Sequence, residues 1–458
     1  MSDAFQDRFP RLAALTPARE RVRAEAGIEA RGLSPEIPEG SARLAELLGA
    51  MAARNEFGEH LALRRWFSDS IGCEPPEDAI EASALRLLAP DAPAEIADPR
   101  RWLFLDTETT GLAGGTGTYA FLVGIAWWDA GGLEVEQFFM RDHSEEHSLL
   151  VALAERMAER RVLVTFNGKS FDWPLLETRY RMTRTIRPPK PRAHLDFLHP
   201  ARNLWRLRLG SVRLPELERG VLGWNRGVDI DSSLIPSIYF DFLRGGSPDP
   251  LVPIFQHNQM DLRGLAGLAA HTVSLLADPE ARGQDALELF GVSRICERRG
   301  ETKRAQGLYA FSIARELPAE PARAARKALA QIAKREGEFD LACGLWEEMA
   351  GQSREGLEAY EQLAIHYERR LREPGRAIVI VRKALAELRR GSRLGTLAPV
   401  LCVRYGKRFE KRLVRLKRRT RGAFPDRGQN AANPESDDAA LESNVETARR
   451  GNSDGQFG

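Results

Sequence analysis

The sequence predicts an α/β domain with a mixed central sheet flanked by helices, followed by an all-α helical module. Two features of the 458-residue chain predict this arrangement. Between residues 99 and 280, short apolar segments of strand type alternate with segments whose apolar residues recur at helical spacing. From about residue 285 onward the spacing is helical throughout. A chain of this length can hold two or three domains, each with its own hydrophobic core.

The elements of the α/β domain follow in a clear order. Strands are expected over residues 102–108, 119–129, 133–140, 161–168 and 193–200. An Ala-Gly-Gly turn joins the second and third of these strands. Helices are expected after Ser144, which can cap the first turn, from about Asp172, and over residues 201–278 with an interruption at 244–253. This succession predicts a sheet with both antiparallel and parallel pairs.

The helical module, residues 285–415, contains three stretches with a shared turn signature: RRGETKRA, REGEFDLA and LREPGRA. Their aligned alanines, Ala305, Ala342 and Ala377, recur at a period close to the roughly 34 residues of a tetratricopeptide (TPR) repeat. Small residues at such positions let paired helices approach closely, and aromatics such as Tyr309 and Trp346 can fill the gaps between helices. We therefore predict a TPR-like module, with generic helical hairpins as the alternative.

The two ends of the chain differ in character from these domains. Residues 1–98 are expected to form an N-terminal extension packed on the α/β domain. Residues 404–421 are densely basic and can either track a phosphate backbone or form the charged face of a terminal helix. The polar residues 422–458 have almost no large apolar groups and are expected to be a disordered tail.

The composition bounds the class of protein. Hydrophobic residues make up 43% and charged residues 29%, which is typical of a soluble globular protein. The 67 basic and 65 acidic residues nearly cancel, so any nucleic-acid surface must be local. Four widely spaced cysteines predict no disulfide framework, and a cytoplasmic location is expected. The N-terminus lacks the apolar core of a signal peptide, and no apolar run is long enough for a transmembrane helix, so no membrane partner is expected.

The central motif is Asp106-Thr107-Glu108 inside the first predicted strand of the α/β domain. Alternation along a strand places residues i and i+2 on one face, so both carboxylates point the same way. Two such carboxylates repel each other and resist desolvation, and a divalent cation with a preference for hard oxygen ligands relieves both costs. A solvent-facing polar strand is the alternative for an isolated motif of this kind.

Two further motifs supply carboxylates. In FNGKSFDW, Asn167 ends an apolar strand and Asp172 opens a helix, where it either caps the helix or delivers a carboxylate to the end of the sheet. In HNQMD, His257 and Asp261 are four residues apart and share one helix face. An ordinary surface contact is the alternative for this last pair.

Taken together, D-x-E, N-x₃-F-D and a ring-bearing residue four before an Asp resemble the three exonuclease motifs of the DEDD superfamily. The spacing is similar to that of the proofreading domains of family-B DNA polymerases. The FLDTETTGL start and the TPR-like helices resemble more closely the YprB-type ribonuclease H-like family. The resemblance covers about 180 residues well and the helical C-terminus loosely.

The resemblance implies a ribonuclease H-like exonuclease domain over residues 99–280. It implies that Asp106, Glu108, Asp172 and Asp261 bind two divalent metal ions, Mg²⁺ or Mn²⁺, and that His257 orients or deprotonates the attacking water. One departure concerns the histidine. The superfamily usually has a tyrosine four residues before the last Asp or a histidine five before it, whereas His257 stands at the tyrosine spacing. A neutral imidazole can nevertheless serve as a base near pH 7.

Three more residues are predicted to contact the substrate: Thr107, Asn167 and Trp173. Asn167 can hydrogen-bond the substrate or cap a strand end, and Trp173 can stack a base or belong to the core. Asp196, on a late strand, can support a metal ion indirectly or be an ordinary strand-end residue.

The predicted function is a metal-dependent 3′–5′ exonuclease that hydrolyses phosphodiester bonds of single-stranded DNA or RNA from the 3′ end by a two-metal-ion mechanism. The helical module is expected to bind a protein partner. Two alternatives remain open. One is a structure-selective endonuclease of the same fold, and the other is a catalytically silent TPR scaffold.

Overall fold

The computed structural model describes residues 39–422 except 69–70, 72–75, 77, 112–115, 284 and 352–355. The predicted disordered tail, beyond Gly422, and the first 38 residues therefore lie outside the described residues. The chain divides into two units between Ala277 and Asp278. Each unit is described separately below.

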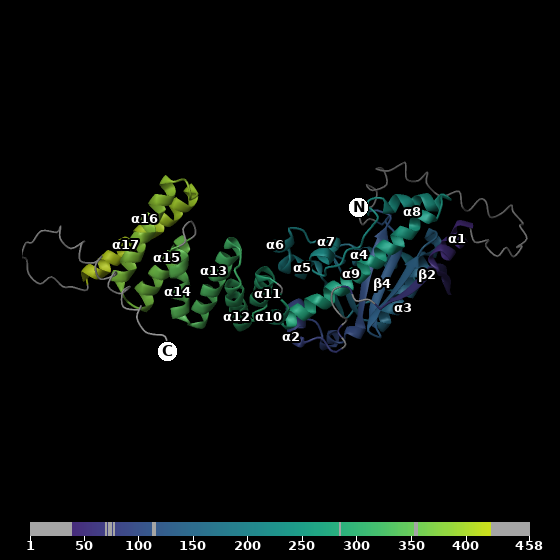
Figure 1. Cartoon of the computed structure of the whole chain (residues 1–458), viewed down its shortest axis with the longest axis horizontal. Coiled ribbons are helices and arrows are strands. Elements are labelled where there is room, and N and C mark those ends of the chain that lie inside the picture. The colour runs from purple at the N-terminus through teal and green to yellow at the C-terminus, as the bar shows by residue number, and fades with distance from the viewer. Residues whose placement is uncertain are drawn as a thin grey trace, which may run out of the picture. The chain divides into compact units, whose positions relative to one another are not determined.

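A seven-stranded sheet forms the centre of the first unit (Figure 1). Its strands are β1 (Met51–Asn55), β2 (Gly58–Phe67), β3 (Trp102–Thr109), β4 (Ala120–Asp129), β5 (Gly132–Phe139), β6 (Val162–Thr165) and β7 (Ala193–Asp196). The spatial order is β1-β2-β5-β4-β3-β6-β7. β3 pairs antiparallel with β4 and parallel with β6, and β6 pairs parallel with β7, so the sheet is mixed as predicted.

The described part of the predicted N-terminal extension is built into this sheet. β1 and β2 form a hairpin, and β2 pairs antiparallel with β5 from Leu61 opposite Phe139 to Phe67 opposite Leu133. These strands therefore extend the sheet at one edge, and residues 51–67 are part of the same layer as the later strands.

Helices cover both faces of the sheet. On β5, the neighbouring residues Glu136 and Gln137 point to opposite faces, because side chains alternate along a strand. Glu136 accepts hydrogen bonds from Arg156 of α3 (Glu146–Glu159), whereas Gln137 donates to Asn258 of α9 (Val252–Ala277). The helices α3 and α9 consequently lie on opposite faces. This explains why every residue of β4 from Ala120 to Trp128 is buried.

The remaining helices of the first unit are α1 (Glu39–Leu48), α2 (Ala82–Leu88), α4 (Asp172–Thr183), α5 (Leu198–Leu204), α6 (Arg206–Leu209), α7 (Leu214–Gly220) and α8 (Ile235–Leu243). The helical stretch expected over residues 201–278 needs one correction. The break expected at 244–253 is present, with α9 beginning at Val252, but residues 221–234 also form no helix. Gly223 and Gly227 take positive φ values of 67° and 75° there, a conformation that ends a helix and that glycine adopts at little cost.

The described part of the second unit is all-helical, as predicted (Figure 1). Its helices are α10 (Pro279–Arg282), α11 (Ala286–Arg298), α12 (Thr302–Ala314), α13 (Ala319–Glu336), α14 (Phe339–Gly351), α15 (Gly356–Ile365), α16 (Pro374–Arg393) and α17 (Pro399–Gly422). From α11 onward each helix packs against the next. The aligned alanines Ala305, Ala342 and Ala377 are all fully buried, as close helix packing requires. The assignment to TPR repeats stays a prediction.

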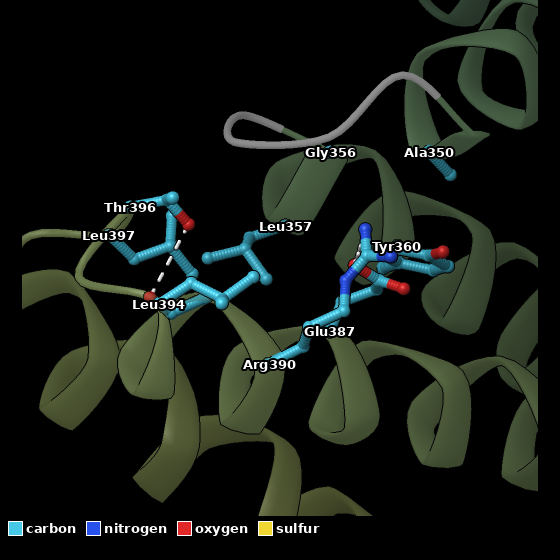
Figure 2. A pocket seen from close by; sticks show the side chains of 10 residues that line it. Ala350, Gly356, Leu357, Tyr360, Glu387, Arg390, Leu394, Thr396 and Leu397 are labelled. Carbon is cyan, nitrogen blue, oxygen red and sulfur yellow. Dashed lines mark hydrogen bonds and ion pairs between the residues drawn. The ribbon is translucent and has the colours of Figure 1, made fainter.

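A cavity of about 310 Å³ lies in the second unit between α15, α16 and the turn that follows α16. Figure 2 shows Leu394 and Leu397 on one side of it and Tyr360 on the other, beside an ion pair of 2.9 Å between Glu387 and Arg390. All the residues that line it belong to the second unit.

Among the described residues, no helix is both long and apolar enough to cross a membrane. Cys296, Cys343 and Cys402 are free. The cytoplasmic location expected from the cysteines stays a prediction.

Candidate metal centre

The D-x-E motif lies where β3 leaves the core. The first four residues of β3 are buried and the last four, beginning with Asp106, are half-buried. Asp106 stands opposite Gly124 of β4, on the face that α9 covers. A Cβ atom at Gly124 would lie only 2.0 Å from Oδ1 of Asn258, so the glycine allows α9 to approach this part of the sheet. Glu108 shares the face of Asp106.

A buried chain of amides orients one side of Asp106. Gln259 donates to Oε1 of Gln137 (2.7 Å), and Gln137 donates in turn to Oδ1 of Asn258 (2.8 Å). With its oxygen engaged in this way, Asn258 directs its NH₂ group to Oδ2 of Asp106 (2.8 Å). The amide chain therefore fixes the direction of the Asp106 carboxylate.

Asp172 is the first residue of α4, and the helix cap is the residue before it, Phe171. The Thr107 hydroxyl donates a hydrogen bond of 2.6 Å to Oδ1 of Asp172. This bond joins the start of α4 to the D-x-E strand. Thr107, predicted to contact the substrate, thus holds a carboxylate of the site.

The loop between β6 and α4 is held by Asp196. Its carboxylate accepts from the backbone N–H groups of Asn167 (2.8 Å), Lys169 (3.1 Å) and Leu198 (3.1 Å). Asn167 has a φ of 68°, in the left-handed region that asparagine tolerates better than most residues. Both residues therefore shape the turn that leads into α4. This arrangement explains Asp196 as a structural residue, and the predicted substrate contact of Asn167 stays a prediction.

The two aromatic residues that flank Asp172 differ in exposure. Trp173 is 9% exposed and packs in the main core cluster, which accounts for it as a core residue and argues against the predicted stacking on a base. Phe171 is 59% exposed. An exposed aromatic ring next to a predicted ligand is the better placed of the two to stack a base.

The HNQMD motif lies on α9, as expected. Nε2 of His257 is 3.5 Å from Oδ2 of Asp261, and Nδ1 of His257 is 2.7 Å from Oδ1 of Asp229. Burial acts to raise the pKa of Asp229, but the hydrogen bond and charge of His257, together with the hydrogen bonds from Arg226 and the backbone of Ile230, hold this pKa below its ordinary value. Asp229 is therefore a carboxylate that only accepts hydrogen bonds. This partner favours the neutral tautomer of His257 with the proton on Nδ1, which leaves the lone pair of Nε2 on the side of Asp261, 3.5 Å from Oδ2.

A buried arginine stands behind these residues. Arg226 contacts Glu218 (2.5 Å), Asp229 (3.2 Å) and Oδ1 of Asp261 (2.5 Å), and its side chain is only 4% exposed. Burial opposes its charge, yet its bonds to Glu218 and Asp261 outweigh that effect and raise its pKa further. Burial raises the pKa of Glu218 to about 7, although Arg226 opposes the shift. Arg226 therefore fixes the position of Asp261 through Oδ1, whereas His257 lies near Oδ2.

The pKa values of three carboxylates of the site, Asp106, Glu108 and Asp172, are raised above their ordinary values. Removal from water comes first, followed by repulsion from Asp261 and Asp172, and together they raise the pKa of Asp106 well above its ordinary value. The pKa of Glu108 is raised well above its ordinary value by the same causes in the same order. Removal from water raises the pKa of Asp172 to about 6, against the hydrogen bond from Thr107. The structure thus brings all four predicted metal ligands into one electrostatic cluster, which we call the acidic cluster.

The acidic cluster fits a divalent cation. Glu108, His257 and Asp261 each offer a ligand atom within 4.8 Å of the other two. The hard carboxylate oxygens of Glu108 and Asp261, together with those of Asp106 and Asp172, are the donors that Mg²⁺ and Mn²⁺ prefer. Removal from water raises the pKa of Asp106 and Glu108 first, and repulsion from Asp261 and Asp172 adds to it; a bound cation would relieve that repulsion.

Sequence reasoning missed Asn258, Glu218, Arg226 and Asp229. Asn258 follows His257 directly, so its place in the helical motif was a usable signal. Glu218, Arg226 and Asp229 lie in α7 and in the irregular segment 221–234, where no spacing marks a residue that will meet α9.

The comparisons with known proteins agree with this geometry. Residues 103–273 match the ribonuclease H (RNase_H) superfamily. The chain is 29% identical over 319 residues to the uncharacterized protein YprB of Bacillus subtilis (strain 168), a match that covers 69% of this chain and 74% of that protein. It also matches a family B DNA polymerase of the archaeon Pyrobaculum calidifontis, with 15% identity and a TM-score of 0.32 over 46% of this chain. The chain spans only 29% of that polymerase, and a match at this level carries no argument about function. All five residues of the predicted catalytic set lie within residues 103–273, and this part of the chain is a ribonuclease H superfamily domain.

Proposed function

We propose that the chain is a metal-dependent 3′–5′ exonuclease that hydrolyses single-stranded DNA or RNA. A ribonuclease H superfamily domain implies a nuclease and a nucleic-acid substrate. The observation that carries the proposal is the acidic cluster, in which removal from water raises the pKa of Asp106, Glu108 and Asp172, and repulsion from Asp261 and Asp172 adds to the shift of Asp106 and Glu108. Such crowding costs stability unless a ligand of opposite charge binds, so it supports a cation site.

In this proposal Asp106, Glu108, Asp172 and Asp261 hold two divalent ions, Mg²⁺ or Mn²⁺. When bound, such ions stabilise the negative charge that develops on the attacking and leaving oxygens of a phosphodiester. Asn258 and Thr107 keep the carboxylates of Asp106 and Asp172 in fixed directions. Preformed directions reduce the cost of ordering the ligands when an ion binds.

His257 would accept the proton of the attacking water at Nε2. Asp229 holds the Nδ1 proton and so leaves the Nε2 lone pair on the side of Glu108 and Asp261. The charge of Asp229 also favours the imidazolium ion that forms when Nε2 takes up a proton. The spacing of four residues between His257 and Asp261 places both on one face of α9, which supports this role for His257.

Cleavage of end-labelled oligonucleotides tests the proposal. Full-length chain is incubated with 5′-labelled single-stranded DNA or RNA in Mg²⁺, Mn²⁺ or EDTA. Asp106→Asn removes one ligand charge at nearly constant shape. Asp241→Asn, at a side chain that is 72% exposed on α8, is the matched control.

We expect a ladder that shortens from the 3′ end in the presence of metal for the wild type and for Asp241→Asn, and none for Asp106→Asn. A single internal product would replace the exonuclease with the endonuclease alternative. Absence of cleavage by folded protein in every metal would refute the proposal in favour of the scaffold alternative. The protein partner predicted for the second unit stays a prediction.

A further inference from the structure

The last helix, α17, carries an unusual concentration of positive charge. Ten of its 24 residues are Arg or Lys and one, Glu410, is acidic. The sequence left two interpretations open for this segment, a phosphate-binding surface or a solvated helix face. The structure shows which of the charges are neutralised within the protein.

The apolar side of α17 is already covered. Phe409 and Leu416 are fully buried and belong to a core cluster shared with α15 and α16. The helix is therefore packed along its length against its own unit. Its main apolar side is not available for insertion into a bilayer or into the groove of a partner protein.

Acidic residues neutralise one flank of α17. Glu368, whose side chain is 3% exposed, accepts from Arg412 (2.7 Å), Arg415 (2.7 Å) and Arg419 (3.4 Å). Glu361 pairs with Arg408 at 3.1 Å. These ion pairs attach the flank to the π-helical turn His366–Arg370 and to α15.

Four exposed residues form a second line of charge: Arg404, Lys407, Lys411 and Arg418. Their spacings of three, four and seven residues place them on one face of the helix, with Arg415 between the last two. Within residues 39–422, gaps excepted, no acidic side chain forms an ion pair with any of the four. We call these four residues the basic stripe.

We propose that the basic stripe binds the phosphate backbone of a single-stranded nucleic acid. This inference rests on the proposed function, because a nuclease requires a nucleic-acid substrate. The fourteen residue steps from Arg404 to Arg418 extend over about 21 Å of α-helix, a length along which several phosphates of one strand can lie. Like charges three and four residues apart repel each other along the stripe, and a polyanion relieves that repulsion. Contacts of this type release counterions and read no base sequence.

Binding is tested apart from cleavage. The full chain is titrated against a fluorescein-labelled 30-nucleotide oligothymidylate in EDTA at several salt concentrations, and fluorescence anisotropy is recorded. The stripe variant carries Arg404→Gln, Lys407→Gln, Lys411→Gln and Arg418→Gln. The matched control neutralises four exposed arginines of the first unit: Arg54, Arg100, Arg101 and Arg244, which are 81%, 83%, 53% and 73% exposed. Both variants lose four positive charges, and circular dichroism checks that both are folded.

We expect the control to bind like the wild type and the stripe variant to bind at least about tenfold more weakly at low salt. The slope of log affinity against log salt concentration should fall in magnitude by about 3, because each phosphate contact on a single strand contributes about 0.7. A variant with Arg and Lys exchanged at the four stripe positions keeps the charge and should bind like the wild type.

Unchanged affinity and slope in the stripe variant would overturn the inference, as would an equal loss in the control. A third outcome concerns membranes. If the wild type binds phosphatidylserine vesicles and the stripe variant does not, while both bind oligothymidylate equally, the stripe is a membrane-binding surface and the inference is overturned. If the wild type binds oligothymidylate through the basic stripe but cleaves no oligonucleotide in Mg²⁺ or Mn²⁺, the proposed function is refuted and the nucleic-acid binding by the stripe is supported. If the wild type cleaves oligonucleotides and the stripe variant binds oligothymidylate as tightly as the wild type does, the proposed role of the basic stripe is refuted and the proposed function is not.

Discussion

Asp172→Asn should make the metal-free protein more stable at neutral and alkaline pH. In the folded chain the pKa of Asp172 is raised to about 6 from an ordinary 3.8, mainly because the carboxylate is removed from water. The folded protein therefore keeps this proton at a pH at which the unfolded chain has lost it. It follows that the free energy of unfolding falls as the pH rises from about 4 to about 6, and stays lowered above pH 6.

The shift in the pKa of Asp172 sets the size of the change in the free energy of unfolding. About two pKa units at roughly 1.4 kcal/mol each give an upper limit of about 3 kcal/mol. Asp172 keeps some contact with solvent, and an anion in the first turn of a helix gains about 0.3–1 kcal/mol that Asn loses. Asn still offers an oxygen to the Thr107 hydroxyl, which donates to Oδ1 of Asp172 in the wild type. We therefore expect Asp172→Asn to raise the free energy of unfolding by about 1–2 kcal/mol at pH 8 and to leave it nearly unchanged at pH 4.

Urea unfolding in EDTA at pH 4 and pH 8 measures the difference, with Asp241→Asn as the exposed control. In saturating Mn²⁺ at pH 8 the wild type should instead be more stable than Asp172→Asn, because it gains free energy from metal binding that the variant lacks. An Asp172→Asn protein that is less stable than the wild type at pH 8 in EDTA would refute the electrostatic reasoning. An equal gain at both pH values would do so as well, since it would not depend on ionisation.

Two further substitutions test the supports of the acidic cluster. Asp229→Asn should lower kcat for oligonucleotide cleavage about 10- to 100-fold, because the uncharged amide neither fixes the His257 tautomer nor favours its protonated form; an unchanged kcat would argue against a positioning role. Gly124→Ala should lower the free energy of unfolding by about 1–3 kcal/mol and weaken Mn²⁺ binding, because the added methyl group would meet Asn258, which holds Asp106. Thermal unfolding and a Mn²⁺ titration check this, and a variant as stable as the wild type would show that α9 can move away without cost.

Sequence patterns predicted the strand and helix order of the α/β domain because its elements are strongly periodic. The D-x-E strand could be read as a metal site because alternation alone places Asp106 and Glu108 on one face. Asp261 and His257 followed from helical spacing in the same way. What these residues share is that a local period decides the direction of each side chain.

The remaining features depend on contacts between distant segments. Arg226 and Asp229 reach Asp261 and His257 from an irregular segment whose path follows no period. The hairpin β1–β2 joins the sheet through pairing with β5, about 70 residues away in the sequence. The burial of Trp173 beside the exposed Phe171 depends on how α4 lies against the core, which neighbouring sequence does not determine.

Direct counting of bound Mn²⁺ by electron paramagnetic resonance tests the central claim, that the acidic cluster is a cation site. The full-length protein is titrated with Mn²⁺ beside Asp106→Asn and the exposed control Asp241→Asn. We predict two bound ions per chain for the wild type and the control, and fewer for Asp106→Asn, since Asp106 is one of the four proposed ligands. Equal binding by the wild type and Asp106→Asn, or no binding by the folded wild type, would contradict the account.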